Sequence, residues 1–162
     1  MIFDDLEQLN SHLEKEGRII GLDVGTKTIG VALSDASQTI ATPKLTIKRK
    51  SNQKDFAALE ALVKEYNIKT VIIGLPLNMD GSISKISEFV KNFAVNFNQF
   101  LNDIKISFCD ERLTSFIAED TIYQIKAKDS KRKKLVDQIA AALILQSALD
   151  YLQNIKKYDK SP

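Results

Sequence analysis

The chain has 162 residues, a length typical of one domain, and 44% of them are hydrophobic, which is enough for one core. Its 23 basic and 21 acidic residues leave a formal net charge of +2, so global charge is only a weak argument for a nucleic-acid partner. The single cysteine excludes an intrachain disulfide, and no apolar run approaches the roughly 18 residues that a membrane span needs.

The N-terminal residues 2–16 have apolar side chains spaced as on one face of a helix, and Gly17 ends that pattern. We therefore expect residues 1–17 to form a helical extension of a single domain that spans residues 18–158. The first residues lack the basic and apolar regions of a signal peptide, and one cysteine fits a reducing compartment. These features favour a cytoplasmic protein.

The next part of the chain predicts three strands. The apolar stretches 18–24 and 28–35 are typical of a hairpin whose turn is residues 25–27, Gly-Thr-Lys. A third extended stretch follows at 39–49, and Pro43 within it predicts an edge strand or a bulge, because proline cannot donate a ladder hydrogen bond.

The remainder of the chain alternates between helical and extended patterns. Helices are predicted at 55–66, 84–101, 113–125 and from 135 to about 155, and strands at 70–74 and 104–109. Antiparallel strands followed by crossovers predict the α/β class, with a mixed five-stranded sheet flanked by helices on both faces.

One acid ends the first predicted strand. Asp23 is followed by Gly25 and Thr26, small residues that let a phosphate or a metal approach the backbone. A lone aspartate at the end of a strand is, however, most often a turn or capping residue. Asp23 alone therefore leaves both interpretations open.

Two further acidic positions lie at the ends of other elements. Asp110 and Glu111 directly follow a buried strand and precede Arg112, a combination that suits a metal and a phosphate, although a helix cap with a local ion pair is an equal alternative. Asp137 lies among apolar residues of the last helix. Burying it is costly unless it is paired or binds a metal, but the dipole near a helix start also favours aspartate.

Taken together, these acids predict metal chemistry. Carboxylates that converge at one edge of a sheet repel one another unless divalent cations neutralise them. The only histidine, His12, lies outside the candidate site, so oxygen atoms would hold any metal, which favours Mg²⁺ or Mn²⁺ over zinc. Two metals about 4 Å apart can activate a water and stabilise the leaving oxygen in phosphodiester cleavage.

A basic run precedes the last predicted helix and consists of Lys131, Arg132, Lys133 and Lys134. As a flexible loop near the acids, the run would bind the phosphates of a nucleic-acid backbone. As a solvated charge run, it would have no such role. The sequence leaves both interpretations open.

Four stretches show a family resemblance: GLDVGTKTIGVALSD, VIIGLPLNMDGS, DERLTS and KRKKLVDQIAAALILQ. In this order they closely resemble the YqgF family of RNase H-like proteins, also called Holliday junction resolvase-like proteins or pre-16S rRNA nucleases. The likeness extends from about Arg18 to Leu152, nearly the whole chain. It implies an RNase H-like fold, a bacterial cytoplasmic protein and a metal-dependent endonuclease.

The resemblance also implies roles for individual residues. The family's first-strand acid falls on Asp23, its DER acid on Glu111 with Asp110 beside it, and its last-helix acid on Asp137. Asp23 and Asp137 are expected to bind metal, Asp110 is a further candidate ligand, and Glu111 is expected to bind metal or assist the attacking water. Contacts with nucleic acid are expected from Lys27, Arg112, Lys131, Arg132, Lys133 and Lys134.

One position departs from related enzymes. RuvC-type resolvases have their second acid at the end of the fourth strand, where this chain has IIGLP and no acid. We expect Glu111 to substitute from the next strand.

The function that the resemblance implies is processing of the 5′ end of pre-16S rRNA in ribosome biogenesis. We expect the protein to act on ribosomal particles as a monomer or a weak homodimer. One alternative is a resolvase of branched DNA, for which a dimer is expected. Another is a non-catalytic rRNA-binding factor. DVGTKTIG also resembles the first phosphate loop of sugar kinases and actin-like proteins, but 162 residues leave no room for their second domain.

Overall fold

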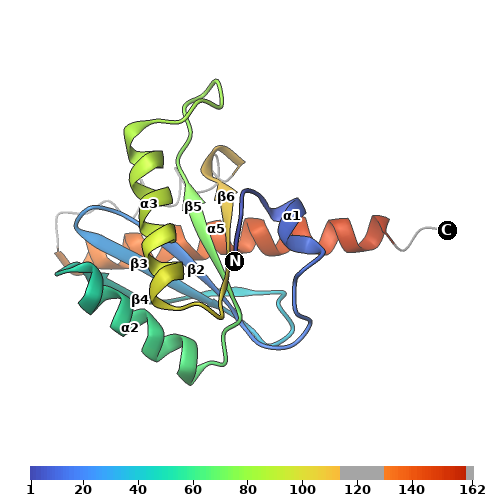
Figure 1. Cartoon of the computed structure of the whole chain (residues 1–162), viewed down its shortest axis with the longest axis horizontal. Coiled ribbons are helices and arrows are strands. Elements are labelled where there is room, and N and C mark those ends of the chain that lie inside the picture. Colours follow the sequence, from blue (N-terminus) through green and yellow to red (C-terminus); the bar gives the residue numbers. More distant parts are fainter. Residues whose placement is uncertain (114–129, 160–162) are drawn as a thin grey trace.

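The computed structural model of the chain describes residues 1–113 and 130–159, and within them it forms one mixed sheet of six strands with helices on both faces (Figure 1). The strands are β1 (Ile2–Phe3), β2 (Ile19–Val24), β3 (Thr28–Ser34), β4 (Ala41–Lys48), β5 (Thr70–Leu75) and β6 (Lys105–Asp110). The helices are α1 (Leu6–Asn10), α2 (Asn52–Glu65), α3 (Lys85–Phe100), the 3₁₀ turn η1 (Glu111–Leu113) and α5 (Ser130–Tyr158).

The strands are ordered β1-β6-β5-β2-β3-β4 across the sheet. The pairs β2–β3 and β3–β4 are antiparallel, whereas β2–β5, β5–β6 and β1–β6 are parallel. This arrangement confirms the predicted α/β class and mixed sheet. Because β2, β5 and β6 run in the same direction, their carboxyl ends meet at one edge, the usual position of a ligand site in such sheets.

The sheet has one strand more than predicted. The prediction of a helix over residues 2–16 is wrong in its extent, because residues 2 and 3 form a strand and the helix covers only residues 6–10. Ile2 and Phe3 pair in parallel with β6, and the N–H of Ile106 donates to the carbonyl of Met1 at 2.9 Å. Without this pairing, β6 would be an edge strand with unsatisfied backbone groups. The helix that follows is only α1, which begins after the N-cap Asp5.

The strand β4 lies at the opposite edge of the sheet, as Pro43 predicts. The β3–β4 register shifts between Val31 and Ala32, and Ala32 pairs with Pro43. Both consequences expected of the proline, an edge position and an irregularity, are therefore confirmed. The missing N–H of Pro43 costs least where the ladder is already interrupted.

The two faces of the sheet pack against different helices (Figure 1). The face covered by α2 and α3 buries an aromatic cluster in which Phe56 contacts both Phe93 and Phe97, with ring centroids 5.2 Å apart in each pair. The other face packs on α1 and α5. Residues alternate between these two cores along each strand, so Leu22 and Val24 face α2 and α3 while Gly21 and Asp23 face α5.

The last helix begins earlier than predicted, at Ser130 rather than at residue 135. The backbone of residues 131–134 is therefore helical, so of the two interpretations left open by the sequence, a flexible loop is wrong. Lysine and arginine are good helix formers, and no glycine or proline interrupts the run. The helix predicted at 113–125 lies outside the described residues, except for Leu113 in η1.

Part of α5, Lys134–Tyr158, is long and apolar enough to cross a membrane by length and composition alone. Its inner face packs on the sheet, where Ala141, Leu145, Ala148 and Leu149 are almost fully buried. One side of α5 therefore forms part of the core of the described fold, and 33% of its most apolar stretch is buried.

Candidate active site

Glycines in three strands allow α5 to lie unusually close to the sheet. A Cβ atom at Gly21 would lie 2.6 Å from the Cβ of Leu145, and one at Gly74 would lie 2.5 Å from the Cδ1 of Ile144. The approach is closest at Gly30, where a Cβ would lie 1.9 Å from the carbonyl oxygen of Asp137. The backbone of Asp137 therefore rests directly on β3.

This contact brings two of the predicted acids together. Gly30 is the cross-strand partner of Asp23 in the β2–β3 hairpin, so Asp137 is held over the same point of the sheet as Asp23. Burial, and then the negative charge of Asp137, raise the pKa of Asp23 to about 6. The hydroxyl of Thr28 donates to Oδ2 of Asp137 at 2.9 Å and fixes the direction of that carboxylate.

The third acid comes from the end of β6. Glu111 begins η1, and its carboxylate turns back over β5, where a Cβ at Gly74 would lie 2.7 Å from Oε1 of Glu111. Burial, followed by the charges of Asp23 and Asp110, raises the pKa of Glu111 to about 7. The Glu111 carboxylate thus occupies the space above the IIGLP stretch, which has no acid of its own.

The neighbouring acid has a different partner. Asp110 accepts hydrogen bonds from the guanidinium of Arg112, with 2.6 Å between Oδ2 and Nη2 and 3.0 Å between Oδ2 and Nε. The backbone N–H of Arg112 also donates to Oδ1 of Asp110. These bonds lower the pKa of Asp110. Asp110 therefore lies beside the three acids but is directed towards Arg112.

Comparison with known proteins gives the family of the chain. The family model described as "RuvX: Holliday junction resolvase" matches residues 17–151. The chain belongs to the RuvX family. This is the family that the four sequence stretches resemble, so the family prediction is confirmed.

Relatives of this RuvX chain cover almost its whole length. A protein of Caldanaerobacter subterraneus subsp. tengcongensis is 47% identical over 138 residues, which are 85% of this chain and 99% of the relative. A protein of Cereibacter sphaeroides strain ATCC 17025 is 40% identical over 152 residues, 94% of each chain. Both are named "Putative pre-16S rRNA nuclease".

Solved structures confirm the predicted RNase H-like fold of this RuvX chain. Thermus thermophilus RuvC in complex with a Holliday junction substrate superposes with a TM-score of 0.55 at 11% identity, covering 85% of this chain and 96% of RuvC. The yeast mitochondrial Holliday junction resolvase superposes with a TM-score of 0.54 at 12% identity, covering 94% of this chain and 86% of the resolvase. At these identities the likeness concerns the fold alone.

The acids of this RuvX chain suit a hard divalent cation. Asp23 repels both Asp137 and Glu111, and among the described side chains it forms no ion pair. Within residues 1–113 and 130–159, no three acidic, histidine or cysteine side chains form a ready-made cage for one ion. An ion held by two carboxylates and several waters fits this arrangement, as Mg²⁺ prefers in proteins.

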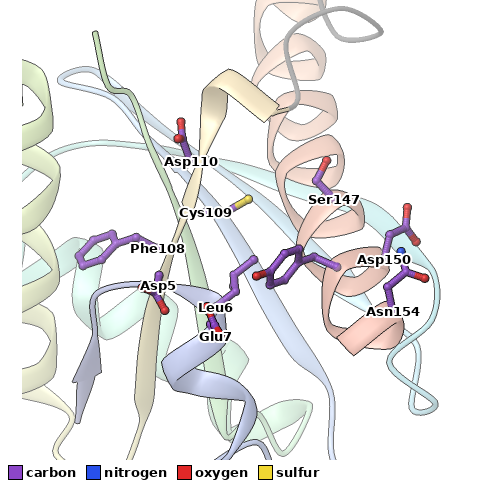
Figure 2. Close-up of a pocket in the computed structure, with 10 residues that line it drawn as sticks. Asp5, Leu6, Glu7, Phe108, Cys109, Asp110, Ser147, Asp150 and Asn154 are labelled. Carbon is purple, nitrogen blue, oxygen red and sulfur yellow. The ribbon is translucent and has the colours of Figure 1, made fainter. Parts of the chain in front are cut away.

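A cavity of about 470 Å³ lies between α1, the end of β6 and α5, and Asp110 is the one candidate acid in its lining (Figure 2). Figure 2 shows Cys109 on its β6 wall, with the sulfur directed towards α5. Burial, and then the charges of Asp110 and Glu111, raise the pKa of the Cys109 thiol to about 12. The thiol is therefore protonated at neutral pH and unsuited to nucleophilic attack.

Basic side chains near the acids are only partly described. Lys27 is exposed in the turn after β2, and Lys134 is exposed in the first turns of α5. The carbonyl of Lys134 accepts a hydrogen bond from the hydroxyl of Thr46, so the start of α5 lies against β4. The side chains of residues 131–133 lie outside what the structure describes.

A buried ion pair that was not predicted from the sequence fixes the turn after Asp23. The guanidinium of Arg49 donates to Oδ2 of Asp55 and to the carbonyl of Gly25, at 3.1 Å in each case. The Arg49 and Asp55 side chains are only 12% and 2% exposed, and the backbone N–H of Arg49 donates to the carbonyl of Lys27. The sequence signal that could have revealed this ion pair is Asp55, an acid on the apolar face of α2, because a buried acid requires a partner.

The raised pKa values predict how a divalent ion affects stability. Asp23 and Glu111 hold protons in the folded state up to about pH 6 and 7, so without metal the stability falls as pH rises from about 4 through this window. An ion bound to the ionised acids reverses this loss. We expect Mg²⁺ or Mn²⁺ at ten times its dissociation constant to raise Tm by about 4 °C near pH 8 and by much less near pH 5.

Thermal unfolding with Mg²⁺ or EDTA, at matched ionic strength, measures this effect. Asp23→Asn is the control, because removing one acid should reduce the shift near pH 8. An equal rise at both pH values would indicate general screening and contradict binding at these carboxylates.

Proposed function

We propose that this chain is a divalent-metal-dependent endonuclease that processes the 5′ end of pre-16S rRNA in ribosome biogenesis. The observation that supports it most is the placement of Asp23, Asp137 and Glu111 at the carboxyl edge of the sheet in a RuvX chain, with two raised pKa values. The names of the relatives supply the substrate. Acids placed so that they repel are costly to the fold, and binding a cation explains that cost.

In this proposal the acids have different roles. Asp23 and Asp137 hold the metal, and the hydroxyl of Thr28 keeps the Asp137 carboxylate oriented. Mg²⁺ or Mn²⁺ held there would supply the charge that activates a water and stabilises the leaving oxygen. Glu111, with a pKa of about 7, is suited to take the proton of the water that attacks phosphorus as the P–O bond breaks.

The basic side chains would position the RNA backbone. Lys27 and Lys134 are exposed, and Lys131, Arg132 and Lys133 extend the same helical turns. Each phosphate contact adds to binding without giving sequence specificity. Asp110 and Arg112 bind each other, and we assign them to holding the end of β6 rather than to metal or phosphate.

The substrate would be a ribosomal particle in the cytoplasm, and the enzyme would act as a monomer. A second candidate is a dimeric resolvase of four-way DNA junctions. The description of the RuvX family and the fold shared with RuvC favour that candidate. Both candidates use the same acids and differ in the nucleic acid that reaches them.

One cleavage panel tests the proposal and separates the candidates. Wild-type protein and Asp23→Asn are compared with Mg²⁺ or Mn²⁺ on RNA that contains an extended 16S 5′ end and on a DNA four-way junction. Cutting of the RNA by wild-type protein alone is the expected result, and cutting of the junction alone would make the chain a resolvase. Binding of RNA by both proteins without cutting would make it a non-catalytic rRNA-binding factor.

A further inference from the structure

The loop between β5 and α3, residues 76–84, is an ordered hairpin that projects beyond the sheet (Figure 1). We call it the β5–α3 hairpin. Leu77 and Ile83 form an antiparallel bridge, and the N–H of Asn78 donates to the carbonyl of Ser82 at 3.0 Å. The N–H of Gly81 closes the turn on the carbonyl of Asn78 at 2.8 Å. The hairpin thus has a defined shape in the absence of a partner.

Side chains at the turn strengthen this shape. The amide nitrogen of Asn78 donates to the hydroxyl of Ser82 at 2.9 Å, and the N–H of Ser82 donates to the carboxylate of Asp80 at 2.9 Å. Gly81 has a φ of +84°, a left-handed conformation that glycine adopts without strain. These hydrogen bonds hold the turn within the hairpin, and the Met79 side chain lies at its tip.

The hairpin exposes an unusual amount of apolar surface. Met79 at the tip is 92% exposed, more than any other large hydrophobic side chain in the described residues. Ile83 on the same hairpin is 54% exposed, and Ile86 at the start of α3 is 48% exposed. A single exposed hydrophobic residue needs no explanation, but a group of them on one rigid element indicates a contact surface.

Arg112 forms hydrogen bonds with both the hairpin and Asp110, the residue that precedes Glu111. Nη1 of Arg112 donates to the carbonyl of Met79 at 3.2 Å, and Nη2 binds Asp110 at 2.6 Å. A Cβ at Gly81 would lie 3.3 Å from Nη1, so the guanidinium packs directly on the turn. Because Asp110 immediately precedes Glu111, the tip is fixed relative to the carboxylates. The hairpin tip therefore lies beside the carboxyl end of β6, from which the Glu111 side chain extends towards Gly74.

We propose that Met79 is a nucleobase-contacting wedge, which packs against one base beside the scissile phosphate and unstacks it from its neighbour. The proposal rests on the proposed nuclease function. Methionine is among the apolar side chains that separate base steps, and its polarisable thioether suits the face of a base. Two exposed side chains on the hairpin and one at the start of α3 are too few for a stable protein interface, which buries about 800 Å² on each partner.

Fluorescence of 2-aminopurine measures the unstacking directly. The base is placed singly at positions on either side of the cut in the extended 16S RNA, with Mg²⁺ present. Asp23→Asn serves as the parent protein, so that the strand stays intact. We expect binding of the parent to raise the fluorescence at one position, and binding of the parent with Met79→Leu to do the same.

With Met79→Ser in the parent, we expect the fluorescence rise to disappear and the RNA to bind about tenfold more weakly. Ile40→Ser is the matched control. Ile40 is also exposed, at 60%, but it lies in the β3–β4 connection at the opposite end of the sheet from Asp23. It should leave both readouts unchanged.

Two results would overturn the wedge while leaving the nuclease intact. One is an equal fluorescence rise with Met79→Ser, which would make the tip a surface for another class of partner. The other is tight RNA binding by the parent without a rise at any position. Failure of the parent to bind the RNA or a four-way junction would instead contradict the proposed function, and the wedge with it.

Discussion

Replacing Asp23 with asparagine is expected to abolish cleavage and to stabilise the metal-free protein. Cleavage should fall by roughly 10³-fold, equivalent to about 4 kcal/mol, because the amide cannot hold the ion that activates the water. Stability should rise by about 2 kcal/mol near pH 7, since the ionised carboxylate is half-buried next to Asp137 and its pKa is raised to about 6. Asparagine has nearly the same volume and removes this charge.

The pH dependence of that stabilisation follows from the sign of the shift. A carboxyl group whose folded pKa is raised destabilises the fold most above about pH 6 and has no such effect below about pH 4. The gain from Asp23→Asn should therefore be largest above about pH 6 and vanish in acid. Chemical denaturation of both proteins across this range, in EDTA, measures it.

Asp35→Asn is the matched control for Asp23→Asn, and its expected effect on stability has the opposite sign. The Asp35 carboxylate accepts hydrogen bonds from the N–H groups of Thr39 and Ile40 and the hydroxyl of Ser37, which lower its pKa to about 2. Its contribution to stability is present above about pH 4 and is lost as pH falls towards 2. Asp35→Asn should therefore reduce stability at neutral pH and leave cleavage unchanged. Cleavage by purified Asp23→Asn at the wild-type rate would remove Asp23 from the mechanism.

Gly30→Ala is expected to lower both the stability of the fold and the rate of cleavage. The new methyl group would lie 1.9 Å from the carbonyl oxygen of Asp137 and 2.5 Å from its carbonyl carbon, both in the backbone of α5. No change of rotamer relieves this overlap, so α5 must move away from β3. We expect a loss of about 3 kcal/mol and a fall in Tm of about 10 °C.

The same shift should reduce cleavage by about 10²-fold, because it moves Asp137 relative to Asp23. Gly25→Ala is the control for stability, since its nearest neighbour is one backbone oxygen at 3.1 Å, and it should change Tm far less. Thermal unfolding and single-turnover cleavage of the three proteins measure both effects. A Gly30→Ala protein with wild-type Tm would mean that α5 does not press on β3.

Much of the fold could be predicted because its signals are local. The β2–β3 hairpin follows from two apolar stretches around a Gly-Thr-Lys turn, and Pro43 marks β4 as an edge strand by lacking an N–H. The acids could be recognised as candidates because each lies where a strand or the last helix begins or ends. The resemblance to one family then assigned expected roles to Asp23, Glu111 and Asp137.

The arrangement of these acids was decided by contacts between residues far apart in the chain. Two residues of β1 have no strand pattern of their own and are extended only because β6 offers an unpaired edge. Gly30 and Gly74 give no sequence signal of a site, yet their missing side chains let Asp137 and Glu111 approach β3 and β5. Which carboxylates are present, and in which elements, can be read from the sequence. How near they lie depends on tertiary packing, because burial and mutual repulsion involve atoms that the fold brings together in space.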